Sequence, residues 1–339
     1  MALYNIERSG VLRPIILGLL AALFFATTFV LNRGMELSGG SWIWSASLRF
    51  IFMVPFLLVI VIRRNNLKPL LELMKEKPWE WVLWSTVGFG LFYAPLCFAT
   101  VFSPGWLVAG TWQFTIIAGS LLAPLFYETI HTKEGSIKIR GKIPLKGLLF
   151  SLIILLGIGC MQLEQAESLT TRDFWLGIIP VVIASFAYPL GNRKMMVIAN
   201  GRLDVFQRVL GMTLASMPLW LVLSVYGVIE VGMPSASQTF QSMVVAISSG
   251  VIATALFFKA TDMVKDNMQR LASVEATQSI EVLFALMGEI IFLSLAFPSP
   301  LSWLGIVLVI IGMILHSYLS HVGVKANSNV NLQPKKARI

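Results

Sequence analysis

Long apolar runs, separated by short polar turns, fill most of the 339-residue chain. Each run is about 20 residues long, which is the length that an α-helix needs to cross a bilayer, and none shows the strict alternation of a barrel strand. Because backbone groups in lipid must bond within their own segment, the pattern predicts membrane-spanning helices. The ten predicted helices cover residues 14–33, 41–62, 79–101, 105–127, 144–163, 174–192, 205–226, 238–260, 271–296 and 299–320.

The composition excludes a water-soluble protein. Hydrophobic residues make up 56% of the chain, charged residues only 13%, and the mean hydropathy is +0.78. An ordinary soluble domain has roughly 25% charged residues. The expected fold class is therefore an all-α integral membrane protein with ten transmembrane helices.

The basic residues predict an orientation in the membrane. Lysine and arginine number 26 against 17 acidic residues, a net charge of +9. If both termini are cytoplasmic, the inner loops hold most of these basic residues, and the opposite loops hold only Arg33 and Arg172. We therefore expect a multi-pass protein of the cytoplasmic (inner) membrane, with residues 1–13 and a basic tail, 321–339, inside. This distribution does not indicate a nucleic-acid partner.

A repeated helix ending predicts an internal duplication. FATTFVLNR (25–33) is echoed by FAYPLGNR (186–193), so that Asn192 follows Asn32 by 160 positions. Gly90 and Gly250 have the same separation. The expected halves are residues 14–163 and 174–320, with five helices each. Since five is odd, the halves cross the membrane in opposite directions, which is the inverted-repeat plan of secondary transporters. The alternative is a duplicated scaffold without transport.

Several short motifs resemble one known superfamily. ASLRFIFMVPFLL in the second helix, APLFYE at the end of the fourth and MGEIIF in the ninth are similar to the drug/metabolite transporter superfamily. Within it they resemble the ten-helix EamA-type and multidrug resistance efflux branch. The resemblance implies an exporter, or sometimes an importer, of small metabolites and drugs, with a cavity between helices one, three and four and helices six, eight and nine. It also implies a structural role for Glu289. In the ninth helix this chain departs from the pattern, because no proline there matches Pro124.

The ninth helix carries the main candidates for proton coupling. A charge near the bilayer centre costs about 2.5–3.5 kcal/mol, so it calls for a function. At 100° per residue, Glu275, Gln278 and Glu281 follow one another at steps of about 60° on one helical face. We predict that Glu275 and Glu281 exchange protons and that Gln278 binds substrate. The alternative is that these carboxylates pair with Lys259 or Arg208, or extend to the edge of the membrane.

The intramembrane cations are predicted to be structural. Arg208 and Lys259 lie near inner helix ends and can extend their heads to the interface. Arg49 lies about 12 Å into the second helix, from a rise of 1.5 Å per residue, and needs a partner. Because the resemblance places the second helix outside the cavity, we also assign Arg49 a structural role.

Aromatic and proline residues complete the candidate site. Aromatic faces attract organic cations, and prolines leave a helix carbonyl without its usual donor. The remaining predicted substrate-binding residues are Tyr93, Trp112, Gln113 and Tyr188, and the predicted gating or hinge residues are Pro95 and Pro189.

No catalytic or metal-binding motif is present in the sequence. There is no Walker loop and no HExxH, and the chain has three histidines. We predict a monomeric secondary transporter, without cofactor or metal, that exports drug-like cations or metabolites by proton antiport with alternating access. Its expected partners are the small-molecule substrate, the lipid bilayer and protons. The alternatives are a proton-independent permease or importer for amino acids or similar solutes and, more remotely, a membrane-embedded enzyme.

Overall fold

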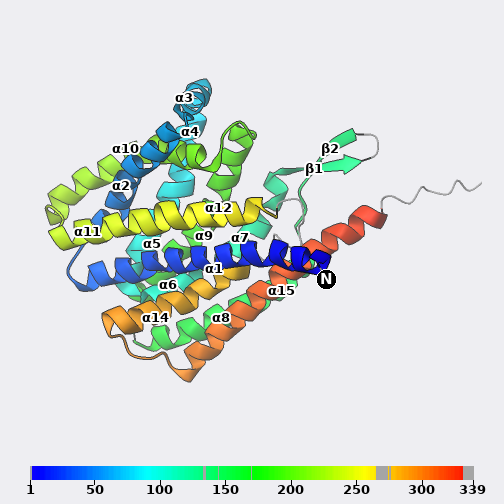
Figure 1. The fold of residues 1–339 in the computed structure, drawn as a ribbon. Helices are drawn as coiled ribbons and strands as arrows, with labels where there is room; N and C mark the ends of the chain where they lie inside the picture. Colours follow the sequence, from blue (N-terminus) through cyan, green and yellow to red (C-terminus); the bar gives the residue numbers. More distant parts are fainter. Residues whose placement is uncertain are drawn as a thin grey trace, which may run out of the picture.

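The structure is a computed structural model that describes residues 2–132, 135–143, 145–168, 170–264, 274 and 276–330. Apart from one hairpin, its described elements are helices (Figure 1). The elements up to residue 168 are α1 Ala2–Leu37, α2 Trp42–Arg63, α3 Leu67–Glu76, α4 Pro78–Ser85, η1 Thr86–Gly90, α5 Leu91–Phe102, α6 Gly105–Trp112, α7 Phe114–Leu121, η2 Ala123–Leu125, β1 Tyr127–Thr132, β2 Gly135–Arg140 and α8 Leu145–Ser168. Those that follow are α9 Thr171–Ala199, α10 Val205–Val231, α11 Ala236–Val245, η3 Ala246–Ala253, α12 Thr254–Asp262, η4 Thr277–Ile280, α14 Glu281–Leu293 and α15 Pro300–Val330.

Six helical segments of the described chain are long and apolar enough to cross a membrane. They correspond to predicted helices one, two, three, six, seven and eight. Two shorter apolar helices, Leu148–Leu163 and Pro300–Leu315, match predicted helices five and ten. The predicted helices at 105–127 and 271–296 are broken into shorter pieces in the structure.

Three features differ from the sequence-based expectation. α1 begins at Ala2 and α15 continues to Val330, so helix extends into both predicted terminal segments. The fourth predicted helix ends early, and β1 and β2 form an antiparallel hairpin that the all-helical prediction missed. Both strands contain threonine or isoleucine at several positions, and β-branched residues favour strands. Figure 1 shows the hairpin at the end of the molecule where the N-terminus lies.

Side-chain caps define the ends of several helices. The hydroxyl of Ser41 accepts a hydrogen bond from the backbone N–H of Ile43 at 3.2 Å, at the start of α2. Asp204 and Gln207 form a reciprocal capping box at the start of α10. Asn200 ends α9 in the left-handed conformation, which asparagine tolerates. These caps satisfy backbone groups that a helix end leaves without an internal partner.

Helices from the first part of the chain pack against helices from the second. α1 packs against α11, η3, α12 and α14, whereas α9 packs against α4, η1, α5, α6 and α7. α2 pairs with α10, and α8 pairs with α15. In the last pair the two helices lie very close together where two glycines face each other. A Cβ added at Gly157 would lie 2.6 Å from the carbonyl oxygen of Gly305, and a Cβ added at Gly305 would lie 2.6 Å from that of Gly157.

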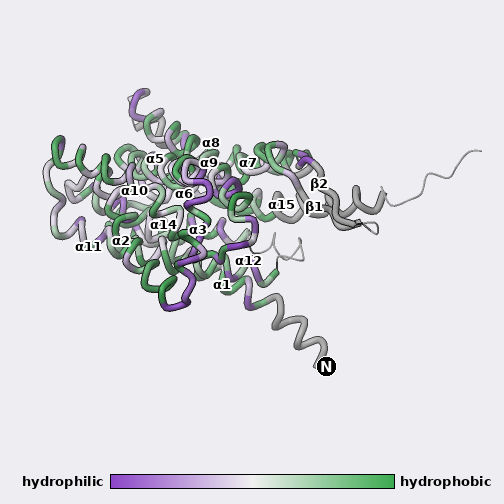
Figure 2. The backbone as a smooth tube through the Cα atoms, turned by 90° about the horizontal axis from the view of Figure 1, so that it is seen from above, coloured by the Kyte–Doolittle hydropathy of each residue, from purple (hydrophilic) through white to green (hydrophobic). Residues whose placement is uncertain are grey.

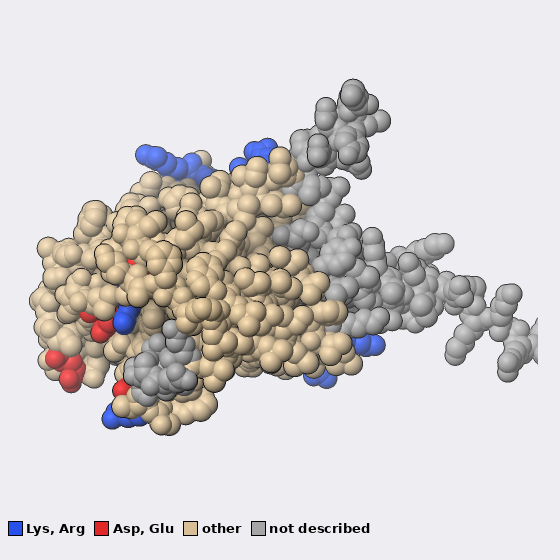
Figure 3. Space-filling model, turned by 90° about the horizontal axis from the view of Figure 1, so that it is seen from below, with Lys and Arg blue, Asp and Glu red and all other residues tan. Residues whose placement is uncertain are grey.

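The outside of the molecule is apolar. Figure 2 shows hydrophobic colour along the helices and hydrophilic stretches at helix ends and connections. The face in Figure 3 is mostly free of charged side chains, and the few that it carries lie mainly towards its margins. Large apolar side chains such as Ile229 and Phe292 are exposed over about three quarters of their surface (75% and 78%). Such a surface suits lipid, since a soluble protein rarely exposes so large an apolar area.

Candidate functional site

A cavity of about 530 Å³ lies between the two interleaved sets of helices. Its volume falls within the range of roughly 300–1,000 Å³ that is typical of small-molecule sites. Its aromatic lining comprises Phe25, Phe29, Phe50, Phe89, Phe92, Trp112, Tyr188, Phe257 and Phe258. Its polar lining comprises Thr28, Arg49, Gln113, Thr115, Ser120, Lys142, Asn192, Arg193, Arg208, Ser249, Thr254, Gln278 and Glu281.

Gln113 interrupts the helix that borders one side of the cavity. Its backbone N–H bonds the carbonyl of Gly110 at 3.1 Å, three residues back, so the α-helical ladder breaks between α6 and α7. Its side-chain Nε2 donates to the carbonyl of Ala109 at 3.1 Å, the acceptor that its own N–H would serve in an unbroken helix. The side chain therefore stabilises the interruption and lies against the cavity, as predicted for a substrate-binding residue.

Pro189 removes one backbone hydrogen bond from α9 at the cavity wall, although the helix itself continues. Proline has no N–H, so the carbonyl of Ser185 lacks its usual helical donor. The hydroxyl of Thr115 on α7 donates to this carbonyl at 3.2 Å. The proline thus joins α9 to α7 through a side-chain hydrogen bond. Its role as a hinge stays a prediction.

Two π-helical segments also border the cavity. η1 contributes Phe89, and η3 contributes Ser249. η3 begins at Ala246, which follows the first residue of η1, Thr86, by 160 positions. Single π-helical turns within α-helices are frequent at functional sites.

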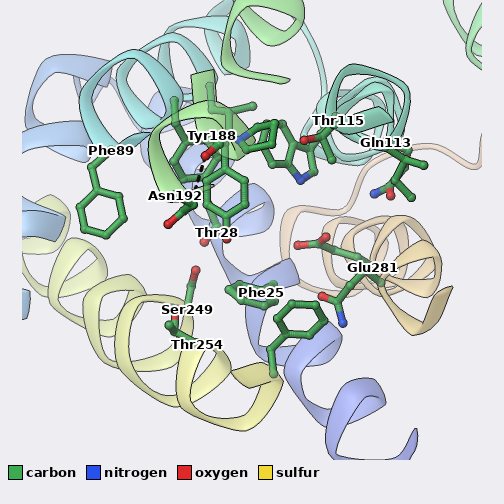
Figure 4. Close-up of a pocket in the computed structure, with 18 of the residues that line it drawn as sticks. Phe25, Thr28, Phe89, Gln113, Thr115, Tyr188, Asn192, Ser249, Thr254 and Glu281 are labelled. Atoms are coloured by element: carbon green, nitrogen blue, oxygen red, sulfur yellow. Dashed lines mark hydrogen bonds between the residues drawn. The ribbon is translucent and has the colours of Figure 1, made fainter. Parts of the chain in front are cut away.

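Glu281 is a buried carboxylate that faces the cavity. It is the first residue of α14 and is only 5% exposed. It forms no hydrogen bond or ion pair within the described chain, although Arg49 acts on it electrostatically. Figure 4 shows its carboxylate directed into the space near Thr28 and Phe25.

Arg49 also lines the cavity, which corrects its expected position outside it. The side chain is 6% exposed, and its guanidinium lies 4.0 Å from the centre of the Tyr93 ring. Its Nη2 donates to the hydroxyl of Ser249 at 3.0 Å. α2 packs directly against η3 and α5, so the long side chain reaches the cavity from a helix that the resemblance placed outside.

The other two predicted structural cations have different positions. Arg208 lines the cavity, with its guanidinium 5.3 Å from the centre of the Phe258 ring. This corrects the prediction that its head extends to the membrane interface. α10 packs against α12, so the side chain finds an aromatic partner inside the protein. Lys259 is exposed and is not part of the lining.

Several predicted binding and hinge residues lie elsewhere. Tyr93 is fully buried behind the lining, where Asn32 Nδ2 donates to its hydroxyl at 3.2 Å. Pro95, on the same helix, is also absent from the lining. Gln278 does line the cavity, and its Nε2 donates to the carbonyl of Gly18 at 3.2 Å. Glu275 lies outside the described residues.

Glu289 lies away from the cavity, where α14 meets the start of α6, at the end of the molecule that we call the closed end. It is fully buried, and its carboxylate accepts hydrogen bonds from the backbone N–H groups of Gly105 at 2.6 Å and Trp106 at 3.1 Å. The carboxylate therefore caps the N-terminus of α6, which agrees with a structural role. Nearby, Arg33 Nη1 donates to the carbonyl of Thr100 at 2.6 Å. The cavity instead extends towards exposed Lys142, at the opposite end.

Sequence reasoning did not single out Thr28, Thr115, Ser249 or Asn192 as site residues. Hydroxyl groups in apolar helices are common, so the first three carried no distinctive signal. Asn192 stood in the repeated helix ending, and its Nδ2 donates to the carbonyl of Tyr188 at 3.0 Å. Among the described residues, no cluster of three His, Cys, Asp or Glu side chains could hold a metal ion.

Known proteins resemble this chain over most of its length. Residues 12–322 match the family model described as "EmrE: Putative multidrug resistance efflux transporter". The "Uncharacterized protein YjlA" of Bacillus subtilis (strain 168) is 61% identical over 309 residues, which cover 91% of this chain and 95% of the relative. A Shouchella clausii protein, "Uncharacterized 42.1 kDa protein in intracellular alkaline protease 3'region", is 50% identical over 274 residues, covering 81% and 71%. A solved structure titled "Crystal structure of protein" has a TM-score of 0.58 at 11% identity and covers 88% of this chain and 98% of its own, which shows a shared fold.

Proposed function

Because the chain belongs to the EmrE family of the drug/metabolite transporter superfamily, a family of multi-pass membrane transporters, we propose that it exports small organic molecules by secondary transport. The observation that carries this proposal is the cavity of about 530 Å³ between interleaved helices. Interrupted membrane helices at such a cavity are typical of secondary transporters, because the broken backbone supplies polar groups near the bilayer midplane. Here the helices broken near Gln113 and Glu281 both border the cavity.

The proposed architecture is two inverted repeats of five helices, residues 14–163 and 174–320. The reciprocal packing supports it, because α1 contacts α11, η3, α12 and α14 much as α9 contacts the corresponding elements of the first repeat. The π-helical segments support it too, since η1 and η3 start 160 positions apart, the separation of the repeated Asn-Arg pairs. A single chain then contains both halves of the transport path and acts as a monomer.

The proposed orientation makes this structure an inward-open state. With both termini in the cytoplasm, the end that bears Lys142 and Arg193 faces inside, in line with the excess of basic residues in inner loops. The outer end is closed around Glu289 and Arg33. Alternating access would close the inner end and open the outer one.

We further propose that Glu281 couples transport to protons. It is a buried carboxylate in the cavity, without a hydrogen-bond partner in the described chain, so a proton or a substrate group can reach it. A buried carboxylate is easier to protonate than an exposed one, because burial disfavours its charged form. In an antiport cycle, the proton enters from outside and leaves when substrate binds from inside.

The test is transport by purified protein in liposomes. Radiolabelled phenethylamine, phenylalanine and 3-phenylpropanoate are supplied outside, first as counterflow substrates and then with an imposed pH gradient that is acidic inside. We expect counterflow of at least one compound and gradient-driven uptake of the same compound. Glu281→Gln should keep counterflow and lose gradient-driven uptake at least about 10-fold, as expected for a lost acid–base group.

The control is Glu80→Gln, which removes an exposed carboxylate whose side chain is 45% accessible. Counterflow of none of the compounds would contradict the transport proposal. Full gradient-driven uptake by Glu281→Gln would contradict coupling at that residue. Equal wild-type flux with and without the gradient would favour the proton-independent permease.

A further inference from the structure

The charges around the cavity do not suit a simple cation. Its described lining contains three arginines and a lysine but a single carboxylate, that of Glu281. Aromatic rings favour cations, which agrees with the sequence-based expectation, but four fixed positive groups repel them. The excess of positive charge points to a ligand that brings a negative group.

Arg49 is the cation best placed to receive that group. Its side chain is more than nine-tenths buried. It forms no ion pair within the described chain, and its Nε has no hydrogen-bond partner. Its Nη2 donates to the neutral hydroxyl of Ser249 at 3.0 Å, and its guanidinium also interacts with the neutral side chain of Tyr93. Glu281 acts on Arg49 only electrostatically, without an ion pair between them in the described chain. A buried charge whose direct partners are neutral is costly, so such a side chain is poised to bind a counter-ion.

A neighbouring polar group also lacks a partner among the described residues. The hydroxyl of Thr28, a residue that is 5% exposed and lines the same cavity, makes no hydrogen bond with them. Arg208 adds a second guanidinium to the lining, held over the ring of Phe258 and without an ion pair in the described chain. These donors complement oxygen acceptors, which a carboxylate provides in pairs.

Next to these donors is an aromatic wall. The rings of Phe92 and Tyr188 lie 4.7 Å apart, and those of Phe92 and Trp112 lie 5.0 Å apart, measured between ring centres. All three residues line the cavity. The wall offers an apolar surface on which a flat ring can pack by offset or edge contacts.

Building on the proposed transport function, we propose that the substrate carries a carboxylate or similar oxyanion, which Arg49 binds, on an aromatic or apolar body. Arg49 binds the oxyanion through its planar fork of N–H donors, and the body packs against Phe92, Trp112 and Tyr188. The carboxylate of Glu281 can bind an amino group on the same molecule. Organic anions and zwitterions therefore belong to the substrate class, whereas molecules with only a positive charge do not.

The first test compares four probes that share one phenyl body. Binding of 3-phenylpropanoate, phenylalanine, phenethylamine and 3-phenylpropanamide to the purified full chain is measured by isothermal titration calorimetry at pH 7. We expect the two carboxylate-bearing probes to bind at least about 10-fold more tightly than the amine and the neutral amide. Equal or tighter binding of phenethylamine would overturn the proposal.

The second test assigns the interaction to Arg49. Arg49→Gln should weaken 3-phenylpropanoate binding at least about 10-fold and leave binding of the amide unchanged. The matched control is Arg63→Gln, which removes an exposed arginine from the other end of the same helix and should change neither. If Arg49→Gln does not fold, Ser249→Ala is the second variant. It removes the hydroxyl partner of the guanidinium and should alter affinity for the carboxylate probes alone. Wild-type affinity for 3-phenylpropanoate in Arg49→Gln, or unchanged affinity for both carboxylate probes in Ser249→Ala, would overturn the assignment.

Transport measurements separate this proposal from the one on which it rests. Counterflow of phenethylamine without counterflow of either carboxylate probe would overturn the substrate class and leave the transporter proposal intact. Binding of the carboxylate probes through Arg49, without counterflow of any probe, would overturn the transporter proposal and leave the binding assignment intact.

Discussion

Glu281 and Glu289 lie on the same helix, α14, and both are almost completely buried, yet their surroundings are opposite. The carboxylate of Glu289 accepts two backbone N–H groups from the start of α6. The carboxylate of Glu281 has no hydrogen-bond partner in the described chain and faces a cavity. One buried charge therefore holds two helices together, and the other is available to a proton or a ligand.

Two arginines differ in a related way. Each leaves its Nε without a hydrogen-bond partner among the described residues. Arg33, at the closed end, donates to the carbonyls of Thr100 and Val101 at the end of α5, whereas Arg49 lines the cavity and donates to the hydroxyl of Ser249. Since burying a charge is costly in either place, the position of each group relative to the cavity indicates which residue stabilises the fold and which serves the site.

Replacing the two glutamates by alanine should produce the largest difference. Glu289→Ala removes a charged acceptor and leaves two buried N–H groups unpaired, so we expect it to lower the free energy of unfolding by about 3 kcal/mol or more. Glu281→Ala should cost far less, because the carboxylate has no hydrogen bond among the described residues. Denaturation of both variants in the same detergent measures the difference, and equal losses would contradict the comparison.

Gly105→Ala tests the same closed end by crowding it. A Cβ at Gly105 would lie 2.6 Å from Glu289 Oε1 and 2.6 Å from the carbonyl oxygen of Phe29. We expect a loss of about 1–3 kcal/mol, as for other overpacked sites. Gly159→Ala is the matched control, because no atom lies within 4 Å of its added Cβ. Thermal unfolding measures the stability of both variants. A Gly105→Ala protein as stable as the control would contradict tight packing around Gly105.

Thr115→Val tests a hydrogen bond on the cavity side. The variant keeps the shape of the side chain but removes the donor to the Ser185 carbonyl, which Pro189 leaves without a helical partner. We expect a loss of about 1 kcal/mol, together with a changed rate of counterflow if this bond holds the hinge. Thr239→Val, whose hydroxyl bonds the carbonyl of Ser235, the N-cap residue of its helix, is the control. Identical stability of the two variants would show that the Thr115 bond near Pro189 contributes no more than an ordinary hydroxyl–carbonyl bond.

The smallest effect is expected at an exposed carboxylate outside the membrane spans. Arg202 donates two hydrogen bonds to Glu76, at 2.9 and 3.0 Å, and these hold the pKa of Glu76 below its usual value of 4.5. A pKa that is lower in the folded state means that the pair stabilises the protein above pH 4.5 and that this contribution disappears as the pH falls through the lowered pKa.

The thermal midpoints of wild type and Glu76→Gln should therefore differ slightly at pH 7 and converge as the pH falls through the lowered pKa of Glu76, where its carboxylate becomes protonated. Added salt should reduce the difference at pH 7, because exposed charges are screened. A difference that persists unchanged at low pH would show that another interaction of Glu76 is responsible.

Local sequence patterns predicted part of the fold well. Six predicted spans appear as long apolar helices, and two more as shorter ones. The resemblance to the multidrug efflux branch is confirmed by the family match over residues 12–322. The breaks at Gln113 and at the start of α14 were not predicted, because a glutamine or a glutamate in an apolar run has no intrinsic tendency to break a helix. At Gln113 the break is stabilised by the side chain's own bond to Ala109.

The candidate site could be predicted only in part. Trp112, Gln113, Tyr188, Gln278 and Glu281 line the cavity as expected. Tyr93 does not, although it is as aromatic and as deeply placed in its helix as Tyr188. The difference is which face of the helix meets the cavity, and that depends on how α5 and α9 are rotated against their neighbours.

The sequence by itself determined that this protein lies in a membrane, roughly where its helices run and which family it belongs to, since hydropathy, charge and short motifs are local properties. Only the tertiary structure decided which buried charges have partners. Glu289 is satisfied by Gly105, 184 positions away, whereas Arg49 and Glu281 come from distant helices and meet at one cavity. The cost or use of a buried charge depends on the groups that surround it, and in this protein those groups are brought together by the packing of helices far apart in the chain.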